Sequence, residues 1–89
     1  MKIEQMTGRT GRPVANQFII TDDDGGESFQ SYNTIIAYAP AGNGKIQLDA
    51  GSWDYSATTG KYRNEFLHET KKETQAKIDS GEYELVDLN

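Results

Sequence analysis

The chain has 89 residues, of which 26% are charged and 35% hydrophobic, and its formal net charge is −5. Its length fits one domain spanning residues 1–89, and the absence of cysteine excludes disulfides and zinc sites built on thiolates. The negative charge balance argues against a general duplex DNA-binding protein, which needs a basic surface.

The N-terminal region predicts a short strand followed by a loop. Residues 1–6 contain one strong apolar anchor, Ile3. Residues 7–13, "TGRTGRP", hold two glycines and a proline without hydrophobic periodicity, which is typical of a loop. This predicted loop carries two cations, Arg9 and Arg12.

A β-hairpin is predicted next. Residues 14–21, "VANQFIIT", are rich in β-branched and aromatic residues, and the turn "DDDGG" separates them from a second run at residues 27–32. Two such runs around a glycine-containing loop are a hairpin signal. If the turn centres on Asp24, Ile19 lies opposite Phe29 as an apolar cross-strand pair.

A second hairpin follows from residues 34–39 and 45–50, which the loop "PAGNG" separates. In the second run, apolar and polar residues alternate, so one face should point inward and the other toward water. The expected cross-strand pairs are Ile36 with Leu48 and Tyr38 with Ile46. Together these runs predict an antiparallel meander of about four strands, whose inner face needs a cover.

That cover is expected from a helix near residues 55–67. Four residues are spaced along one helical stripe: Tyr55, Thr59, Tyr62 and Phe66. Ser56 or Thr58 is the expected N-cap. Gly60 weakens the helix by roughly 1 kcal/mol relative to alanine, so it either shortens the helix to residues 61–67 or allows close contact with the sheet.

The C-terminal region predicts a second helix and a last strand. Thr70 and Glu73 match the capping box that begins a helix, and Gly81 stands where a helix-ending residue with positive φ is wanted. The segment "EYELVDL" then alternates, with Tyr83 and Leu85 on one face. The predicted fold class is therefore α+β: an antiparallel meander of four to five strands with one or two helices packed on one face.

No catalytic residue, metal site or cofactor is predicted. A serine triad needs a histidine base, and the one histidine, His68, lies among charged neighbours between the two helical segments. Counted from Asp22, the acidic turn fails the calcium loop of an EF-hand at three positions, so a polar hairpin tip is the better interpretation. The glycine-containing loops match neither a phosphate loop nor a dinucleotide fingerprint.

The residues left for recognition combine aromatic rings with cations. Tyr55, Tyr62 and Phe66 are explained as the helix face that closes the sheet, whereas Trp53 precedes that stripe and Arg63 points off it. Such residues can stack unpaired bases or anchor a protein partner. The predicted binding residues are Arg9, Arg12, Tyr32, Trp53 and Arg63.

Several strings carry a family resemblance, above all "QSY…IA" and "WDYS…TT.KY…FL". From about Ile3 to Asn89 the chain resembles a family of small, uncharacterised domains encoded by bacteriophages and prophages. The resemblance implies a protein made inside a bacterial cell, and it carries over no activity and no catalytic residue. Small acidic phage proteins often modulate host machinery or host defences.

Three functional hypotheses follow. The leading one is a non-enzymatic phage interaction protein that binds a host or host-defence protein. The second is a binding module for single-stranded nucleic acid or nucleotides, and the third is a small metal-dependent hydrolase that uses acidic residues.

We expect a cytoplasmic protein without a membrane partner, because no N-terminal signal is visible and "TIIAYA" is too short to span a bilayer. An uncovered sheet face would be closed by a second copy, which predicts a homodimer.

Overall fold

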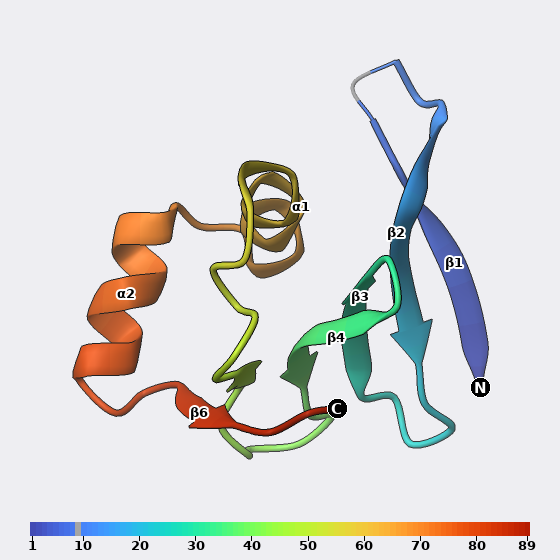
Figure 1. Cartoon of the computed structure of the whole chain (residues 1–89). Coiled ribbons are helices and arrows are strands. Elements are labelled where there is room, and N and C mark those ends of the chain that lie inside the picture. The colour runs from blue at the N-terminus through green and yellow to red at the C-terminus, as the bar shows by residue number, and fades with distance from the viewer. Residues whose placement is uncertain (9) are drawn as a thin grey trace.

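The computed structural model describes residues 1–8 and 10–89. Over these residues the chain forms one six-stranded sheet and two helices (Figure 1). The strands follow one another across the sheet in chain order, from β1 at one edge to β6 at the other. The elements are β1 (Lys2–Thr7), β2 (Pro13–Thr21), β3 (Glu27–Ser31), β4 (Thr34–Ala39), β5 (Gln47–Asp49), α1 (Ala57–Leu67), α2 (Lys71–Asp79) and β6 (Glu84–Val86).

The predicted α+β class is confirmed, but the sheet has one strand more than the four to five expected. β1 to β5 form the predicted antiparallel meander. β6 instead pairs in parallel with β5, because the chain passes through α1 and α2 between these two strands and returns in the same direction. No helix of the described residues is long and apolar enough to cross a membrane.

The register of the first predicted hairpin is confirmed. Ile19 lies opposite Phe29, and Phe29 is completely buried. Its ring stacks on that of Phe66 in α1, with 5.9 Å between ring centroids. This pair therefore marks the face of the sheet that the first helix covers.

The register predicted for the second hairpin is wrong by one residue. Leu48 lies opposite Ala37, not Ile36, and Tyr38 lies opposite Gln47, not Ile46. The connection is longer than the predicted loop, because β5 begins at Gln47 and residues 40–46 separate it from β4. A β-bulge also interrupts the pairing of β4 with β3, where Phe29 pairs with Ala37 but the next residue of β3 pairs with Ile35. Ile36 is thus an extra residue in the strand, and it is buried next to the equally buried Ala37.

The first helix begins later than its predicted stripe. Ser56 is the N-cap and accepts a hydrogen bond from the Thr59 backbone N–H, so Tyr55 precedes the helix and is 75% exposed. The expectation that Tyr55 belongs to the buried face is therefore wrong. Tyr62 is buried as expected, and Gly60 lies inside the helix rather than shortening it.

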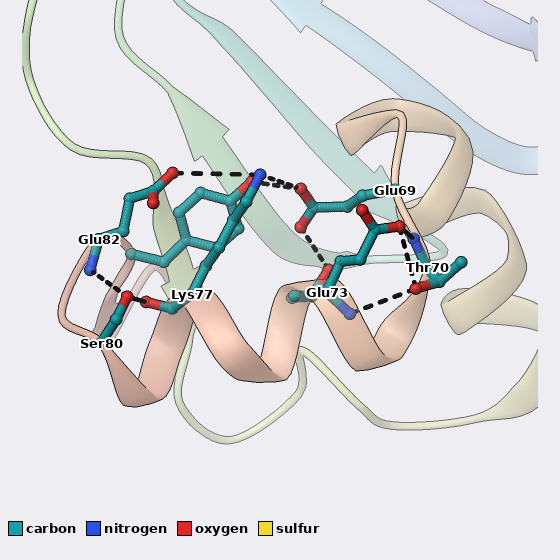
Figure 2. Close-up of polar contacts among 8 residues, drawn as sticks. Glu69, Thr70, Glu73, Lys77, Ser80 and Glu82 are labelled. Atoms are coloured by element: carbon teal, nitrogen blue, oxygen red, sulfur yellow. Dashed lines mark hydrogen bonds and ion pairs between the residues drawn. The ribbon is translucent and has the colours of Figure 1, made fainter.

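The ends of the second helix are as predicted. Thr70 and Glu73 form the complete capping box (Figure 2), and Gly81 has a φ of +82° just after the helix. In the following segment Tyr83 is buried, whereas Leu85 is 45% exposed. Leu85 lies on β6, the edge strand of the sheet, opposite the completely buried Leu48.

A buried carboxylate attaches α2 to the rest of the domain. Glu69 lies in the link between the helices, and its side chain is 3% exposed. It accepts hydrogen bonds from Thr74 Oγ1 at 2.5 Å, from Lys77 Nζ at 2.7 Å and from the Tyr83 hydroxyl at 2.8 Å. Figure 2 shows the Glu69 carboxylate between the start of α2 and the Lys77 amine. Glu69 thus connects both ends of α2 to the segment that leads into β6.

These contacts fix the ionisation of the cluster. Burial disfavours the charged form of Glu69, but the hydrogen bonds from Lys77, Thr74 and Tyr83 outweigh it and lower the pKa of this carboxyl below its ordinary 4.5. Burial and the hydrogen bond to Glu69 raise the pKa of Tyr83 to about 12. A lowered carboxyl pKa stabilises the folded state above pH 4.5, and this contribution is lost as the pH falls through the lowered value.

The substitution Glu69→Gln tests this cluster. We expect it to lower the free energy of unfolding at neutral pH by about 2 kcal/mol, because charge-assisted hydrogen bonds to a buried group are lost. The variant should also lose less stability than the wild type between about pH 5 and about pH 3. Urea unfolding followed by circular dichroism measures both effects. Glu73→Gln is the control, since this exposed residue should cost less than about 1 kcal/mol; equal losses in both variants would contradict the assignment.

Candidate functional site

A cleft of about 680 Å³ opens between the turn that joins β3 to β4 and the segment that leads from β5 into α1. Ser31 and Thr59 lie at its base and share a hydrogen bond of 3.0 Å between their hydroxyl oxygens. Tyr32 and Tyr55 stand exposed at its rim. Serine and threonine side chains make up much of the remaining lining, and none of the described residues that line it is charged. We call this site the tyrosine cleft.

Tyr32 is held at the rim by an uncommon backbone conformation. The loop between β3 and β4 has only two residues, Tyr32 and Asn33, because Ser31 pairs with Thr34. Tyr32 has a φ of +57°, at a turn position where glycine is usual. A left-handed conformation costs a residue with a Cβ roughly 1–2 kcal/mol. Its N–H donates to the Asn16 carbonyl at 2.7 Å, and its side chain is 52% exposed.

Asp49, at the end of β5, holds the segment that leads into α1 and forms the opposite wall of the cleft. This residue is 6% exposed, and its carboxylate accepts hydrogen bonds from the Ser52 hydroxyl and from the Leu88 N–H. Its carbonyl accepts from the backbone N–H of Ser52 and Trp53. The hydrogen bond from Ser52 lowers the pKa of the Asp49 carboxyl, although burial opposes it. These hydrogen bonds of Asp49 therefore fix the turn by which the chain leaves β5 and reaches the cleft.

The same wall is fixed from the helix by Arg63. Its guanidinium donates to the Trp53 carbonyl at 2.6 Å and to the Asn64 side chain at 3.0 Å, and it lies over the Trp53 ring at 5.2 Å. Asp54 is 3.7 Å away. Burial lowers the pKa of Arg63, and the charge of Asp54 opposes this shift. We call this contact the Arg63–Trp53 clamp.

The structure does not assemble the five residues predicted as a binding surface. Tyr32 lines the tyrosine cleft, whereas Trp53 and Arg63 contact each other and are not part of its lining. Arg63 is only 1% exposed, so the expectation that it points to the surface is wrong, because the Trp53 carbonyl and ring hold it inside. Arg12 is exposed in the loop between β1 and β2, which projects beyond the other strands (Figure 1). Arg9 lies outside the described residues.

Sequence reasoning missed Tyr55 as a surface residue. The helical stripe includes Tyr55, but a helix that starts after the Ser56 cap excludes it. The pairing of Ser31 with Thr59 was also missed, because it joins residues 28 positions apart. Among the described residues, no group of three or more His, Cys, Asp or Glu side chains is arranged to hold a metal ion.

The model of a family of unknown function, DUF8033, matches residues 1–82. The chain belongs to this family. The match spans β1 to α2 and so includes the whole tyrosine cleft, while β6 lies beyond it. No curated protein and no solved structure matches the chain. The phage or prophage origin stays a prediction for this member of DUF8033.

The substitution Arg63→Lys tests the Arg63–Trp53 clamp in this DUF8033 domain. Lysine keeps the charge but cannot reach two acceptors in the planar geometry of a guanidinium. We expect the free energy of unfolding to fall by about 2 kcal/mol, with a red shift of the Trp53 fluorescence as its segment loosens. Glu65→Gln, an exposed change on the same helix, is the control and should stay within about 0.5 kcal/mol of the wild type. An unshifted Trp53 spectrum in a destabilised Arg63→Lys variant would contradict the clamp.

Proposed function

We propose that this domain is a non-enzymatic binding protein that engages a protein partner at the tyrosine cleft. The observation that carries the proposal is Tyr32, an exposed aromatic residue held with a positive φ at the rim of the cleft. Strained backbone conformations of this kind persist where the surrounding structure enforces them, and they cluster at binding sites. A glycine or asparagine would form the same turn without the strain, so the turn itself does not require a tyrosine.

The chemistry of the cleft supports a protein partner. Tyrosine is enriched among the residues that dominate binding energy at protein interfaces, because it combines a large apolar ring with a hydroxyl. Tyr32 and Tyr55 supply two such rings, and the hydroxyls of Ser31 and Thr59 supply hydrogen-bonding groups between them. This combination fits an uncharged loop or extended segment of a partner.

The same chemistry gives less support to a nucleotide or single-stranded nucleic acid. Most of the affinity of nucleic-acid complexes comes from cations that neutralise phosphates, and the described lining of the cleft has none. The Arg63 guanidinium is engaged with Trp53 and Asn64, so it does not present a basic surface beside the rings. We therefore favour the protein partner.

The identity of the partner is proposed from the family resemblance. The resemblance to phage and prophage domains supports a component of the host bacterium or of its defences as the partner, and the bacterial cytoplasm as the place of binding. The net charge of −5 favours a partner with a basic surface around the segment that enters the cleft.

Affinity capture with matched variants tests the proposal. The wild-type domain should capture one stoichiometric protein from lysates of bacterial host species. Tyr32→Asn should reduce capture at least about tenfold, since the ring is an interface anchor, and it should not lower the melting temperature, since asparagine tolerates a positive φ. Tyr55→Ala should also reduce capture, because Tyr55 precedes α1 and is exposed.

Leu85→Ala is the control, because it removes a large exposed apolar side chain outside the cleft. Capture that survives both tyrosine changes, or that Leu85→Ala reduces equally, would refute the assignment to the cleft. Tight binding of a single-stranded oligonucleotide, weakened by salt and by Tyr32→Asn, would replace the protein partner with a nucleic acid.

A further inference from the structure

The backbone of one residue in β4 is hydrogen-bonded by a side chain where a strand would be expected. Ile35 lies opposite Gln30 of β3, yet its N–H donates to Asn89 Oδ1 at 2.8 Å and its carbonyl accepts from Asn89 Nδ2 at 3.0 Å. In an antiparallel ladder, only alternate residues bond to a given neighbouring strand. These two bonds therefore lie on the side of β4 that faces away from β3. We call the N–H and carbonyl of Ile35 the Ile35 edge.

The Ile35 edge is open because β5 stops short of it. β5 pairs with β4 at only two positions and ends at Asp49. The next N–H, that of Ala50, donates to the Val86 carbonyl of β6 at 2.8 Å, so the chain turns away from β4. Among the described residues, no strand pairs with β4 at the Ile35 edge. Both chain neighbours of Ile35 line the tyrosine cleft, which places this edge beside the cleft.

The Asn89 side chain occupies the Ile35 edge as a peptide group would. A carboxamide has the same N–H donor and carbonyl acceptor as a peptide unit, and Asn89 uses one of each on a single residue. A residue of an antiparallel strand engages its opposite residue in the same way, through one N–H and one carbonyl. The side chain of Asn89 thus stands in for the backbone of an added strand.

We propose that an extended segment of the protein partner pairs its backbone with the Ile35 edge and replaces Asn89 there. This inference rests on the proposed function and adds to it the conformation of the segment that binds. An extended segment on this edge continues the sheet, and its alternate side chains point toward the helix-covered face. One of them enters the tyrosine cleft between Tyr32 and Tyr55, next to the Ser31 hydroxyl.

The cleft defines the character of that segment. None of its described lining residues is charged, so an uncharged side chain enters it at the lowest desolvation cost. Pairing along a strand edge favours β-branched and aromatic residues. The backbone pairing supplies affinity and the side chain in the cleft supplies specificity, as in other complexes formed by strand addition.

Asn89 is suited to being replaced. Its side chain is exposed, and an exposed hydrogen bond adds little net stability because water satisfies the same groups when it breaks. A partner backbone restores both bonds to Ile35, so no backbone group is left unpaired. The family model matches residues 1–82, which include Ile35 and the cleft but not Asn89.

Peptide selection with matched variants tests the inference. A displayed library of random peptides of about nine residues, a typical upper length for a strand, is selected on Asn89→Ala, and the enriched peptides are synthesised. They should bind Asn89→Ala at least about threefold more tightly than the wild type, because the edge is then free in every molecule. Gln75→Ala removes an exposed carboxamide from α2 and is the control, with an affinity within about 1.5-fold of the wild type.

Two further measurements report on the backbone pairing itself. Methylation of each peptide nitrogen in turn should identify a position where binding falls at least about tenfold, since the donor to the Ile35 carbonyl is lost there. Amide hydrogen exchange of Ile35 should be at least about threefold faster in Asn89→Ala than in the wild type, and the bound peptide should slow it again. Circular dichroism confirms that each variant is folded.

The outcomes separate this inference from the proposed function. Peptides that Tyr32→Asn weakens but that bind Asn89→Ala and the wild type alike would keep the cleft as the binding site and overturn the strand pairing. Peptides that respond to Asn89→Ala and to methylation, but not to Tyr32→Asn, would support the pairing and refute Tyr32 as the anchor. A library that yields no enriched peptide, or a peptide that tolerates methylation at every nitrogen, would overturn the inference.

Discussion

The packing of α1 on β3 is the contact on which the rest of this structure depends. The Phe29 ring is completely buried and stacks on Phe66. Two residues further along β3, and about two turns nearer the start of α1, the Ser31 hydroxyl forms a hydrogen bond with that of Thr59. The first contact is apolar and stabilises the domain through burial, whereas the second is polar and fixes the position of the helix along the strand. Together they place the N-terminus of α1 next to the β3–β4 turn.

The tyrosine cleft follows from that placement. The chain must travel from the end of β5 to the start of α1, and Asp49 and the Arg63–Trp53 clamp hold the connecting segment away from the turn. The space between the segment and the turn is the cleft. Its walls are therefore held by buried polar contacts, while its rim carries two exposed rings. A rigid frame of this kind limits the conformational entropy that the cleft itself loses when a partner binds.

The second helix is attached by a different kind of interaction. Its apolar face is small, with Ile78 packed against the core. Hydrogen bonds of Glu69 to Lys77 and Tyr83 therefore hold α2 in place where apolar burial is limited. A buried carboxylate is stable there because every partner is a hydrogen-bond donor. The domain thus uses apolar packing to hold α1 near the centre of the sheet and the charged Glu69 cluster to hold α2.

Features that depend on residues close together in the sequence could be predicted, whereas features that depend on distant residues could not. The cap at Thr70 and the Ile19–Phe29 pair depend on neighbouring residues or on a short turn, and both are as predicted. The cap of α1 is Ser56, one of the two residues predicted for it. The bulge at Ile36 and the burial of Arg63 depend on contacts with other elements, which local patterns do not encode. For the same reason Tyr32 could be selected as a surface aromatic, but its left-handed backbone and its cleft could not.

The central claim is that Tyr32 is the point at which a protein partner binds. Replacing Tyr32 by a photo-crosslinking aromatic amino acid, and irradiating bacteria that produce the variant, measures this directly. The account predicts one dominant crosslinked protein from position 32 and none when the same crosslinker replaces Leu85. Crosslinks of equal yield from both positions, or none from position 32, would contradict it.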